Sequence, residues 1–293
     1  MIISNIKIFL KKTFFHWFDE YQADSRYGLK GKLIIEKISD IQKITIIESL
    51  LYGKALLLNN CWMTAEFQEK QYHECLVHPA LTSSEEIKKI LIIGGGDGGT
   101  AKQCLLYKEV QHIDLVEIDN LVIKLSKKYL PSIGGNAWYD KRLNIKIEDG
   151  CKWIENCQDN SYDIVIIDGS DPVGPAEGLF NEKFFKDCYR ILRKGGIFAM
   201  QSESPESFEK VHLETLKIIR KIFEYADPLY GHVSIYPSGY WSWIFGAKDS
   251  QRYNKPKAKR VKEISRFCEI WSPRWQNAAF NLITASLERK INQ

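Results

Sequence analysis

Acidic residues and glycines follow four stretches of the sequence that have the composition of buried strands. Gly94–Thr100 (GGGDGGT) follows the first stretch, and Glu117–Asp119 (EID) ends the second, about 20 residues further on. Glu148–Gly150 (EDG) ends the third, and Asp168–Asp171 (DGSD) follows the fourth. Open α/β sheets bind ligands at the carboxyl ends of their strands, so we expect these side chains to meet at one edge of a sheet.

The first of these segments is a G-x-G-x-x-G motif between a strand and a helix, which predicts a nucleotide-type ligand. Gly94 and Gly96 permit a tight turn and the close approach of a ligand to the backbone. An acid of Glu117–Asp119 can accept hydrogen bonds from both ribose hydroxyls, and a further acid of Glu148–Gly150 could meet an adenine amino group. A glycine turn without a ligand is the alternative, and an acid at three consecutive strand ends disfavours it.

Two further acidic features indicate a cationic ligand. Asp97 lies inside the glycine turn, where it would repel a pyrophosphate and suits a group of positive charge. Residues 168–177, DGSDPVGPAE, form a stiff loop with Asp168 and Asp171 three residues apart. An ordinary turn has a similar composition, but this loop leaves a strand at the ligand-binding edge, which favours a functional role.

In this order and spacing, GGGDGG, VEID, EDG and DGSDPVGPAE resemble the spermidine synthase family of polyamine aminopropyltransferases. The resemblance extends from about Trp17 to the end of the chain, because WFDEYQ, QYHECLVHPAL, SKKYLP, YPSG and NAAFNL also match. It implies transfer of the aminopropyl group of decarboxylated S-adenosylmethionine to putrescine, which gives spermidine and methylthioadenosine. It also implies a homodimer or homotetramer.

The resemblance assigns roles to particular residues. Asp168 would be the catalytic proton acceptor, and residues 168–177 would close over the substrates. The residues implied for the amine are Tyr72, His73, Asp97, Asp168, Asp171 and Tyr236. Those implied for the adenosyl donor, the glycine turn included, are Gln42, Gly94, Gly96, Asp97, Glu117, Asp149, Gly150 and Pro175.

The physical chemistry of the implied reaction agrees with an acidic site. The sulfonium already provides a good leaving group, so we expect no metal. An alkyl amine has a pKa of about 10.4 and arrives protonated, so a carboxylate must attract it and help to remove a proton. Asp97 can pair with the ammonium of the aminopropyl group, whereas it would repel the carboxylate of intact S-adenosylmethionine.

The elements that position these residues predict an α/β fold. Residues 30–65 contain short β-rich runs, and residues 65–81 predict a helix ending near Pro79. From Lys88 onward, nearly continuous Ile/Val runs alternate with helical segments, which indicates a mostly parallel, doubly wound sheet of the class I methyltransferase-like (Rossmann-type) kind. We predict an extension at 1–15, a β-rich domain with its following helix at 16–84, and a Rossmann-like catalytic domain at 85–293.

Three expectations concern the later part of the chain. We predict that the helix over residues 181–196 stops at Gly195–Gly196. The basic stretch at residues 250–262 reads as an exposed connection. Residues 280–291, FNLITASLERKI, predict a last helix.

The distribution of charge argues against a nucleic-acid partner. The chain has 41 Lys+Arg and 37 Asp+Glu, but residues 1–12 and 251–262 hold nine of the basic residues and no acid. The remainder therefore has 32 basic against 37 acidic residues. A nucleic-acid binder would spread its basic residues over a folded face.

Two further features suggest a cytoplasmic protein without a membrane partner. No stretch approaches the roughly 18 apolar residues of a membrane span, and the lysines of residues 1–12 interrupt the run that a signal peptide needs. The seven cysteines are odd in number and lack C-x-x-C spacing, which fits scattered reduced thiols better than a zinc site or disulfides.

Four alternatives remain open. A putrescine N-methyltransferase would use intact S-adenosylmethionine, and Asp97 disfavours it. A spermine- or thermospermine-forming enzyme differs in the length of its amine groove. The acidic glycine turn disfavours an NAD-linked oxidoreductase, and the presence of Asp97 and Asp168 disfavours a non-catalytic family member.

Overall fold

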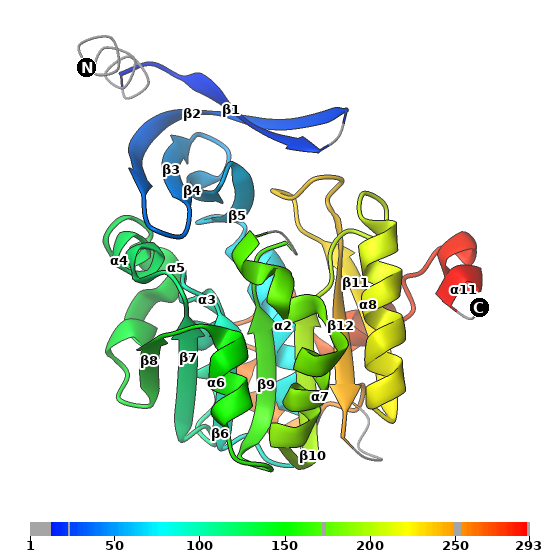
Figure 1. Cartoon of the computed structure of the whole chain (residues 1–293). Coiled ribbons are helices and arrows are strands. Elements are labelled where there is room, and N and C mark those ends of the chain that lie inside the picture. Colours follow the sequence, from blue (N-terminus) through cyan, green and yellow to red (C-terminus); the bar gives the residue numbers. More distant parts are fainter. Residues whose placement is uncertain (1–12, 23, 172–173, 249–252, 292–293) are drawn as a thin grey trace.

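The computed structural model describes residues 13–22, 24–171, 174–248 and 253–291, and it contains two sheets (Figure 1). The smaller sheet is antiparallel, with the order β1-β2-β3-β4-β5. Asn59 and Asn60 join its last two strands with positive φ angles of 49° and 70°, which asparagine tolerates in tight hairpins. Its strands are β1 His16–Gln22, β2 Ser25–Ile38, β3 Lys43–Ser49, β4 Gly53–Leu58 and β5 Cys61–Ala65.

The larger sheet has seven strands in the order β11-β12-β10-β9-β6-β7-β8. The five strands from β10 to β8 run parallel, and β12 is antiparallel to both of its neighbours. The predicted Rossmann-type sheet with a small β domain before it is confirmed. The strands are β6 Lys89–Gly94, β7 His112–Glu117, β8 Leu143–Ile147, β9 Tyr162–Asp168, β10 Leu192–Gln201, β11 Tyr225–His232 and β12 Tyr240–Ala247.

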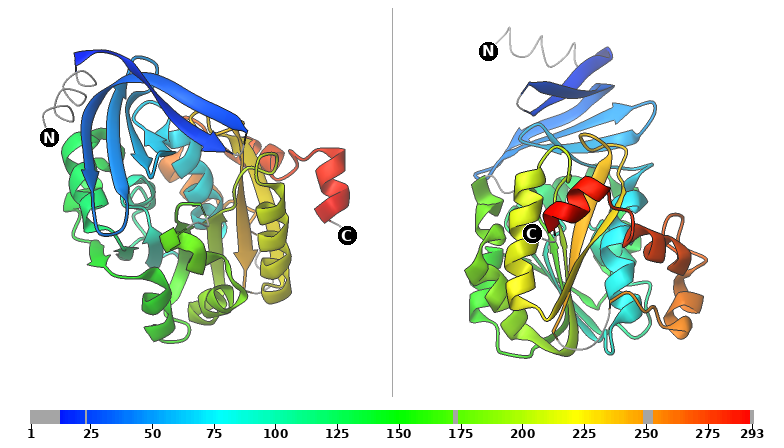
Figure 2. Two further views of the ribbon diagram at one scale, coloured as in Figure 1. Left: turned by 45° about the horizontal axis from the view of Figure 1, so that its top comes forward. Right: turned by 90° about the vertical axis from the view of Figure 1, so that its right-hand side faces the viewer.

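Helices cover both faces of the larger sheet, so its central strands are buried and apolar. Helix α8 lies on one face and α2 on the other, as the right-hand view of Figure 2 shows. The α-helices are α2 Glu69–Ser83, α3 Gly99–Cys104, α4 Asn120–Tyr129, α5 Pro131–Gly134, α6 Gly150–Asn156, α7 Glu182–Ile191, α8 Glu209–Ile222, α9 Ala258–Ile264, α10 Pro273–Ala279 and α11 Ala285–Ile291. Two 3₁₀ helices are η1 Gly135–Tyr139 and η2 Gly174–Phe180.

Several predicted element boundaries are wrong. Helix α2 continues through Pro79 to Ser83, because this half of the helix is buried and packing outweighs the loss of one backbone hydrogen bond. Helix α7 ends at Ile191, and Gly195 lies within strand β10, where the register against β9 shifts. The last helix, predicted over residues 280–291, begins only at Ala285 as α11, because residues 280–284 are not helical.

The described part of the basic stretch, residues 253–262, is only partly an exposed connection. Most of its residues, including its lysines, are exposed, but it contains the start of a helix and two buried residues. Residues from Ala258 form α9, and Arg260 is buried because it donates to the carbonyls of Leu81 and Ser84 at the end of α2. Helix α2 itself contacts strands of the larger sheet. The domain boundary at residue 84 remains a prediction.

Most of the predicted N-terminal extension, residues 1–12, lies outside the described part of the chain. Among the described residues, no helix is long and apolar enough to cross a bilayer.

Candidate active site

A cleft lies at the carboxyl edge of the larger sheet and is also lined by Leu56, Leu58 and Met63 of the smaller sheet. Parallel strands place their carboxyl ends together, which is why residues far apart in the sequence meet here. The predicted site residues that line the cleft are Gln42, Tyr72, His73, Gly94, Gly96, Asp97, Glu117, Asp149, Gly150, Asp168 and Tyr236. Asp171 lines an adjoining pocket, and the side chain of Pro175 lies outside the described residues.

The glycine turn after β6 lies close to the ends of the neighbouring strands β9 and β7. Gly94 has a φ of 82°, and a Cβ atom there would lie 2.2 Å from the carbonyl oxygen of Asp168. A Cβ atom at Gly96 would lie 2.8 Å from Glu117 Oε2. These positions require glycine because the turn, the end of β9 and the Glu117 carboxylate occupy the same small space.

The half of the cleft around β7 and β8 has the polar groups expected for a nucleoside. Glu117 is buried, and burial raises its pKa to about 7. Asp149 caps α6 by accepting from the backbone N–H of Cys151 at 2.8 Å. Gln42 comes from the smaller sheet and donates to Asp119 Oδ2 at 3.2 Å, so both sheets contribute to this half.

Asp168 lines the cleft, and the two residues that follow it line both the cleft and the adjoining pocket. Its Oδ1 accepts a hydrogen bond from Tyr72 Oη at 2.8 Å, and its Oδ2 accepts one from Thr100 Oγ1 at 2.6 Å. Burial and the charge of Asp97 raise the pKa of Asp168 above its usual range. A carboxyl group in such surroundings is a better base than an exposed aspartate. The sequence reasoning missed Thr100, although it directly follows the glycine turn.

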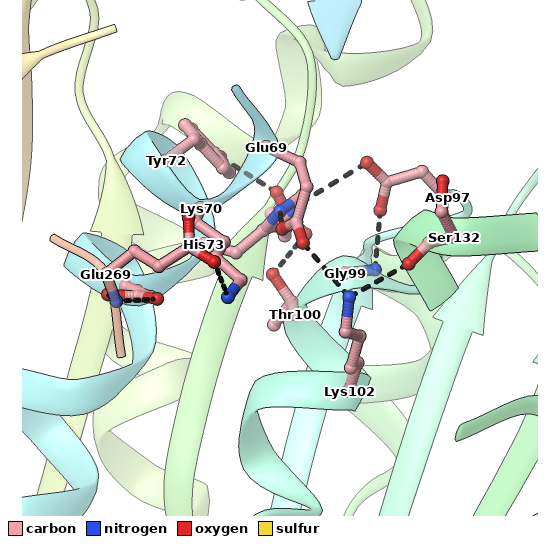
Figure 3. A network of polar contacts seen from close by, with 12 residues as sticks. Glu69, Lys70, Tyr72, His73, Asp97, Gly99, Thr100, Lys102, Ser132 and Glu269 are labelled. Carbon is pink, nitrogen blue, oxygen red and sulfur yellow. Dashed lines mark hydrogen bonds and ion pairs between the residues drawn. The ribbon is translucent and has the colours of Figure 1, made fainter. Parts of the chain in front are cut away.

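His73 lies between two carboxylates, as Figure 3 shows. Its Nδ1 is 2.7 Å from Glu69 Oε2, and its Nε2 is 3.3 Å from Asp97 Oδ2. Asp97 also accepts from the backbone N–H of Gly99 at 2.9 Å. Although burial opposes a charge on Asp97, the charge and hydrogen bond of His73 outweigh it and hold the pKa of Asp97 below its usual range.

The adjoining pocket is lined by two acids, Glu20 from β1 and Asp171, of which the sequence reasoning named only Asp171. A third acid, the buried Glu203, follows the end of β10 and lies next to Asp171. Burial raises the pKa of all three, and for Glu203 the charge of Asp171 adds to the effect. Glu203 could have been found from the sequence, because it follows the fifth parallel strand at the same edge of the sheet.

His73, Asp97 and Asp168 form a close cluster at the site. One oxygen or nitrogen atom from each lies within 4.8 Å of the others. The expectation that no metal takes part remains a prediction.

Comparison with known proteins identifies the family. Residues 69–256 match the family described as "Spermine/spermidine synthase domain". The chain is 62% identical over 280 residues to a polyamine aminopropyltransferase of Prochlorococcus marinus strain NATL2A, covering 96% of this chain and 97% of that protein. The chain belongs to the spermine/spermidine synthase family. A second polyamine aminopropyltransferase, from Prochlorococcus marinus strain MIT 9313, is 56% identical over 275 residues, covering 94% of this chain and 96% of that protein.

Solved structures agree with this assignment. A spermidine synthase in complex with the transition state analogue AdoDATO superimposes with a TM-score of 0.89 at 31% identity, covering 94% of this chain and 95% of that one. Spermidine synthase from Thermotoga maritima gives 0.87 at 31% identity, covering 94% of both chains. The resemblance seen in GGGDGG and DGSDPVGPAE is confirmed, and so is the prediction of a transferase of the polyamine aminopropyltransferase class.

Proposed function

We propose that the protein is a spermidine synthase, which transfers the aminopropyl group of decarboxylated S-adenosylmethionine to putrescine and releases methylthioadenosine. The observation that carries the proposal is the position of Asp168. This half-buried carboxylate lines the cleft, and the two residues that follow it, Gly169 and Ser170, line both the cleft and the pocket that contains Glu20 and Asp171. The related spermidine synthase that binds AdoDATO, a transition state analogue, supports the same pair of substrates.

The donor fits the nucleoside half of the cleft. Glu117 accepts from the ribose hydroxyls, and Asp149, Gly150 and Gln42 surround the adenine end. The aminopropyl chain then points toward Asp97, which pairs with its terminal ammonium. Intact S-adenosylmethionine carries a carboxylate beside that ammonium, and the ionised Asp97 repels it.

The amine enters from the pocket that Glu20 and Asp171 line. Putrescine is a dication, so one end pairs with these acids while the other reaches Asp168. Asp168 first takes a proton from the attacking ammonium group, which frees the lone pair of its nitrogen. The neutral nitrogen then forms the C–N bond as the C–S bond breaks, and the electron pair of the C–S bond goes to sulfur, which leaves as the neutral thioether methylthioadenosine. Alignment of the two substrates supplies much of the remaining acceleration.

The test incubates the purified protein with putrescine and either decarboxylated or intact S-adenosylmethionine, and identifies the products by mass spectrometry. Spermidine made only with the decarboxylated donor supports the proposal. A methylated amine would establish the methyltransferase instead, and product from spermidine in preference to putrescine would establish a spermine- or thermospermine-forming enzyme.

Asp168→Asn tests the proton acceptor. It should lower turnover by about 10²–10⁴-fold, the usual contribution of a positioned base, while the melting temperature stays close to that of the unmodified protein. Near-normal turnover would reject this role for Asp168.

We also propose a cytoplasmic homodimer or homotetramer. All seven cysteines are free, which supports a reducing compartment. Trp17 and Tyr21 expose more than half of their surface on β1, which suits burial against another copy. Sedimentation equilibrium of the purified protein tests the assembly, and a monomer at micromolar concentration would refute it.

A further inference from the structure

The ring of His73 has a carboxylate at each nitrogen. Glu69 Oε2 lies 2.7 Å from Nδ1, and Asp97 Oδ2 lies 3.3 Å from Nε2, on opposite edges of the ring (Figure 3). The His73 side chain is only 3% exposed, so little of the ring is open to water. A neutral imidazole has a single N–H, and only the imidazolium donates from both nitrogens. The geometry therefore favours the charged ring.

Glu69 has the partners that a buried anion needs. Its side chain is 5% exposed, and its second oxygen lies 3.0 Å from Lys102 Nζ. Lys102 also donates to the carbonyl of Ser132 at 2.9 Å, which fixes the ammonium beside Glu69. A buried carboxylate without such partners would take up a proton. Here, although burial opposes ionisation, His73 and Lys102 outweigh it and lower the pKa of Glu69.

Packing prevents the ring of His73 from turning away. A Cβ atom on Gly99 would lie 2.2 Å from His73 Cε1, so the absence of a side chain there makes room for the ring. The ring of Tyr72 meets it edge-on, at 5.3 Å between centroids. Gly99 also donates its backbone N–H to Asp97 Oδ1. Asp97 is thus held at one oxygen by α3 and at the other by His73.

We propose that Glu69 is a positioning residue, which keeps His73 as an imidazolium so that this cation holds Asp97 ionised and aimed into the cleft. The action of Asp97 on the donor ammonium rests on the function proposed above. On this account His73 acts through Asp97, because both of its N–H groups are already engaged.

The charges that face His73 support this account. Glu69 comes from its own helix, Asp97 from the glycine turn and Asp168 from the end of β9. Lys102 opposes them from α3, but it contacts Glu69 rather than the ring. Although burial disfavours the charged ring, Asp97 and Glu69 outweigh it and raise the pKa of His73 well above its usual range.

The first measurement is independent of catalysis. Protein labelled with ¹⁵N-histidine is titrated by NMR, and the His73 signals are identified by their loss in His73→Asn. We expect His73 to stay doubly protonated at pH 8 in the unmodified protein. In Glu69→Gln we expect His73 to lose its second proton at a pH at least about one unit lower than in the unmodified protein. The reason is that an amide oxygen stabilises the cation less than a carboxylate does.

Two further variants complete the design. Lys70→Gln is the matched control, because Lys70 lies on the same turn of α2 but pairs with Glu269, and it should leave His73 unchanged (Figure 3). Glu69→Asp retains the buried charge beside Lys102 and withdraws it from His73, so it provides a folded variant if the Gln protein fails to fold. We expect His73 in Glu69→Asp to lose its second proton at a pH between the values for the unmodified protein and for Glu69→Gln.

The second measurement is kinetic. Glu69→Gln should raise KM for the aminopropyl donor by at least about tenfold, with a smaller change in kcat, and the effect should grow as the pH rises and His73 loses its charge. A neutral His73 at pH 7.5 in the unmodified protein, or an unchanged His73 titration in both Glu69 variants, would overturn the proposal. If the NMR result holds but no aminopropylated product forms, Glu69 keeps its role and the proposed function fails.

Discussion

Tyr72→Phe tests the electrostatic account of Asp168. The phenol of Tyr72 donates to Asp168 Oδ1 at 2.8 Å within a buried site, and phenylalanine removes the donor and retains the ring. A hydrogen bond to a charged group contributes about 1.5–3 kcal/mol. The bond favours the ionised carboxylate, so its loss should raise the pKa of Asp168 by about one to two units at 1.36 kcal/mol per unit.

The sign of the effect on activity follows from the role of Asp168. Burial already raises its pKa, and only the ionised form accepts a proton, so activity falls as the pH falls through that pKa. In Tyr72→Phe the acidic limb of the profile of kcat/KM against pH should move upward by about one to two pH units. Both proteins use the same amine, so ionisation of the substrate contributes equally to the two profiles.

Tyr236→Phe provides the matched control. Tyr236 lines the same cleft, but its hydroxyl donates to the carbonyl of Met63 at 2.7 Å and not to Asp168. Its acidic limb should stay within a few tenths of a pH unit of the unmodified protein. An acidic limb that is unmoved in Tyr72→Phe, or equally moved in both variants, would refute the assignment of the limb to Asp168.

Further predictions concern other parts of the site and its support. Gly99→Ala places a methyl group against the ring of His73 and should lower the free energy of unfolding in urea by about 1–3 kcal/mol, together with activity. Burial raises the pKa of Glu117 to about 7, so calorimetric affinity for methylthioadenosine should be weaker at pH 6 than at pH 8, and Glu117→Gln should remove that difference. Arg260→Ala leaves buried carbonyls at the end of α2 unpaired and should cost on the order of 3 kcal/mol in urea unfolding, whereas exposed Lys262→Ala should cost almost nothing.

The side chains that gather at the carboxyl edge of the larger sheet could be predicted from the sequence, because the order and direction of the strands determine which residues lie there. Once the Ile/Val runs are recognised as parallel strands, the side chains after each strand must gather at one edge. Asp97, Glu117, Asp149 and Asp168 all line the cleft for this reason.

The residues that hold the site and its helices in place could not be predicted from the sequence, because their roles depend on contacts between distant segments. Glu69 is an ordinary acid at the start of a helix until α3 brings Lys102 beside it. Arg260 stands in a basic run that reads as solvated, yet it is buried because the free carbonyls at the end of α2 need a donor. The prediction that the helix ends near Pro79 failed for a related reason, since burial outweighed local propensity.

The acids of the site fall into two groups with different roles. Asp97 has a fixed cationic partner in His73 and stays ionised before any substrate binds. Asp171 and Glu203 have no such partner among their described contacts, and Asp168 faces His73 without a direct contact to it. Burial raises the pKa of all three. A bound dication supplies the missing positive charge and lowers these pKa values again, so binding of the amine should release protons. A neutral or anionic ligand would leave the same carboxylates buried and unpaired. The site therefore selects for positive charge at the step of binding, before any group is transferred.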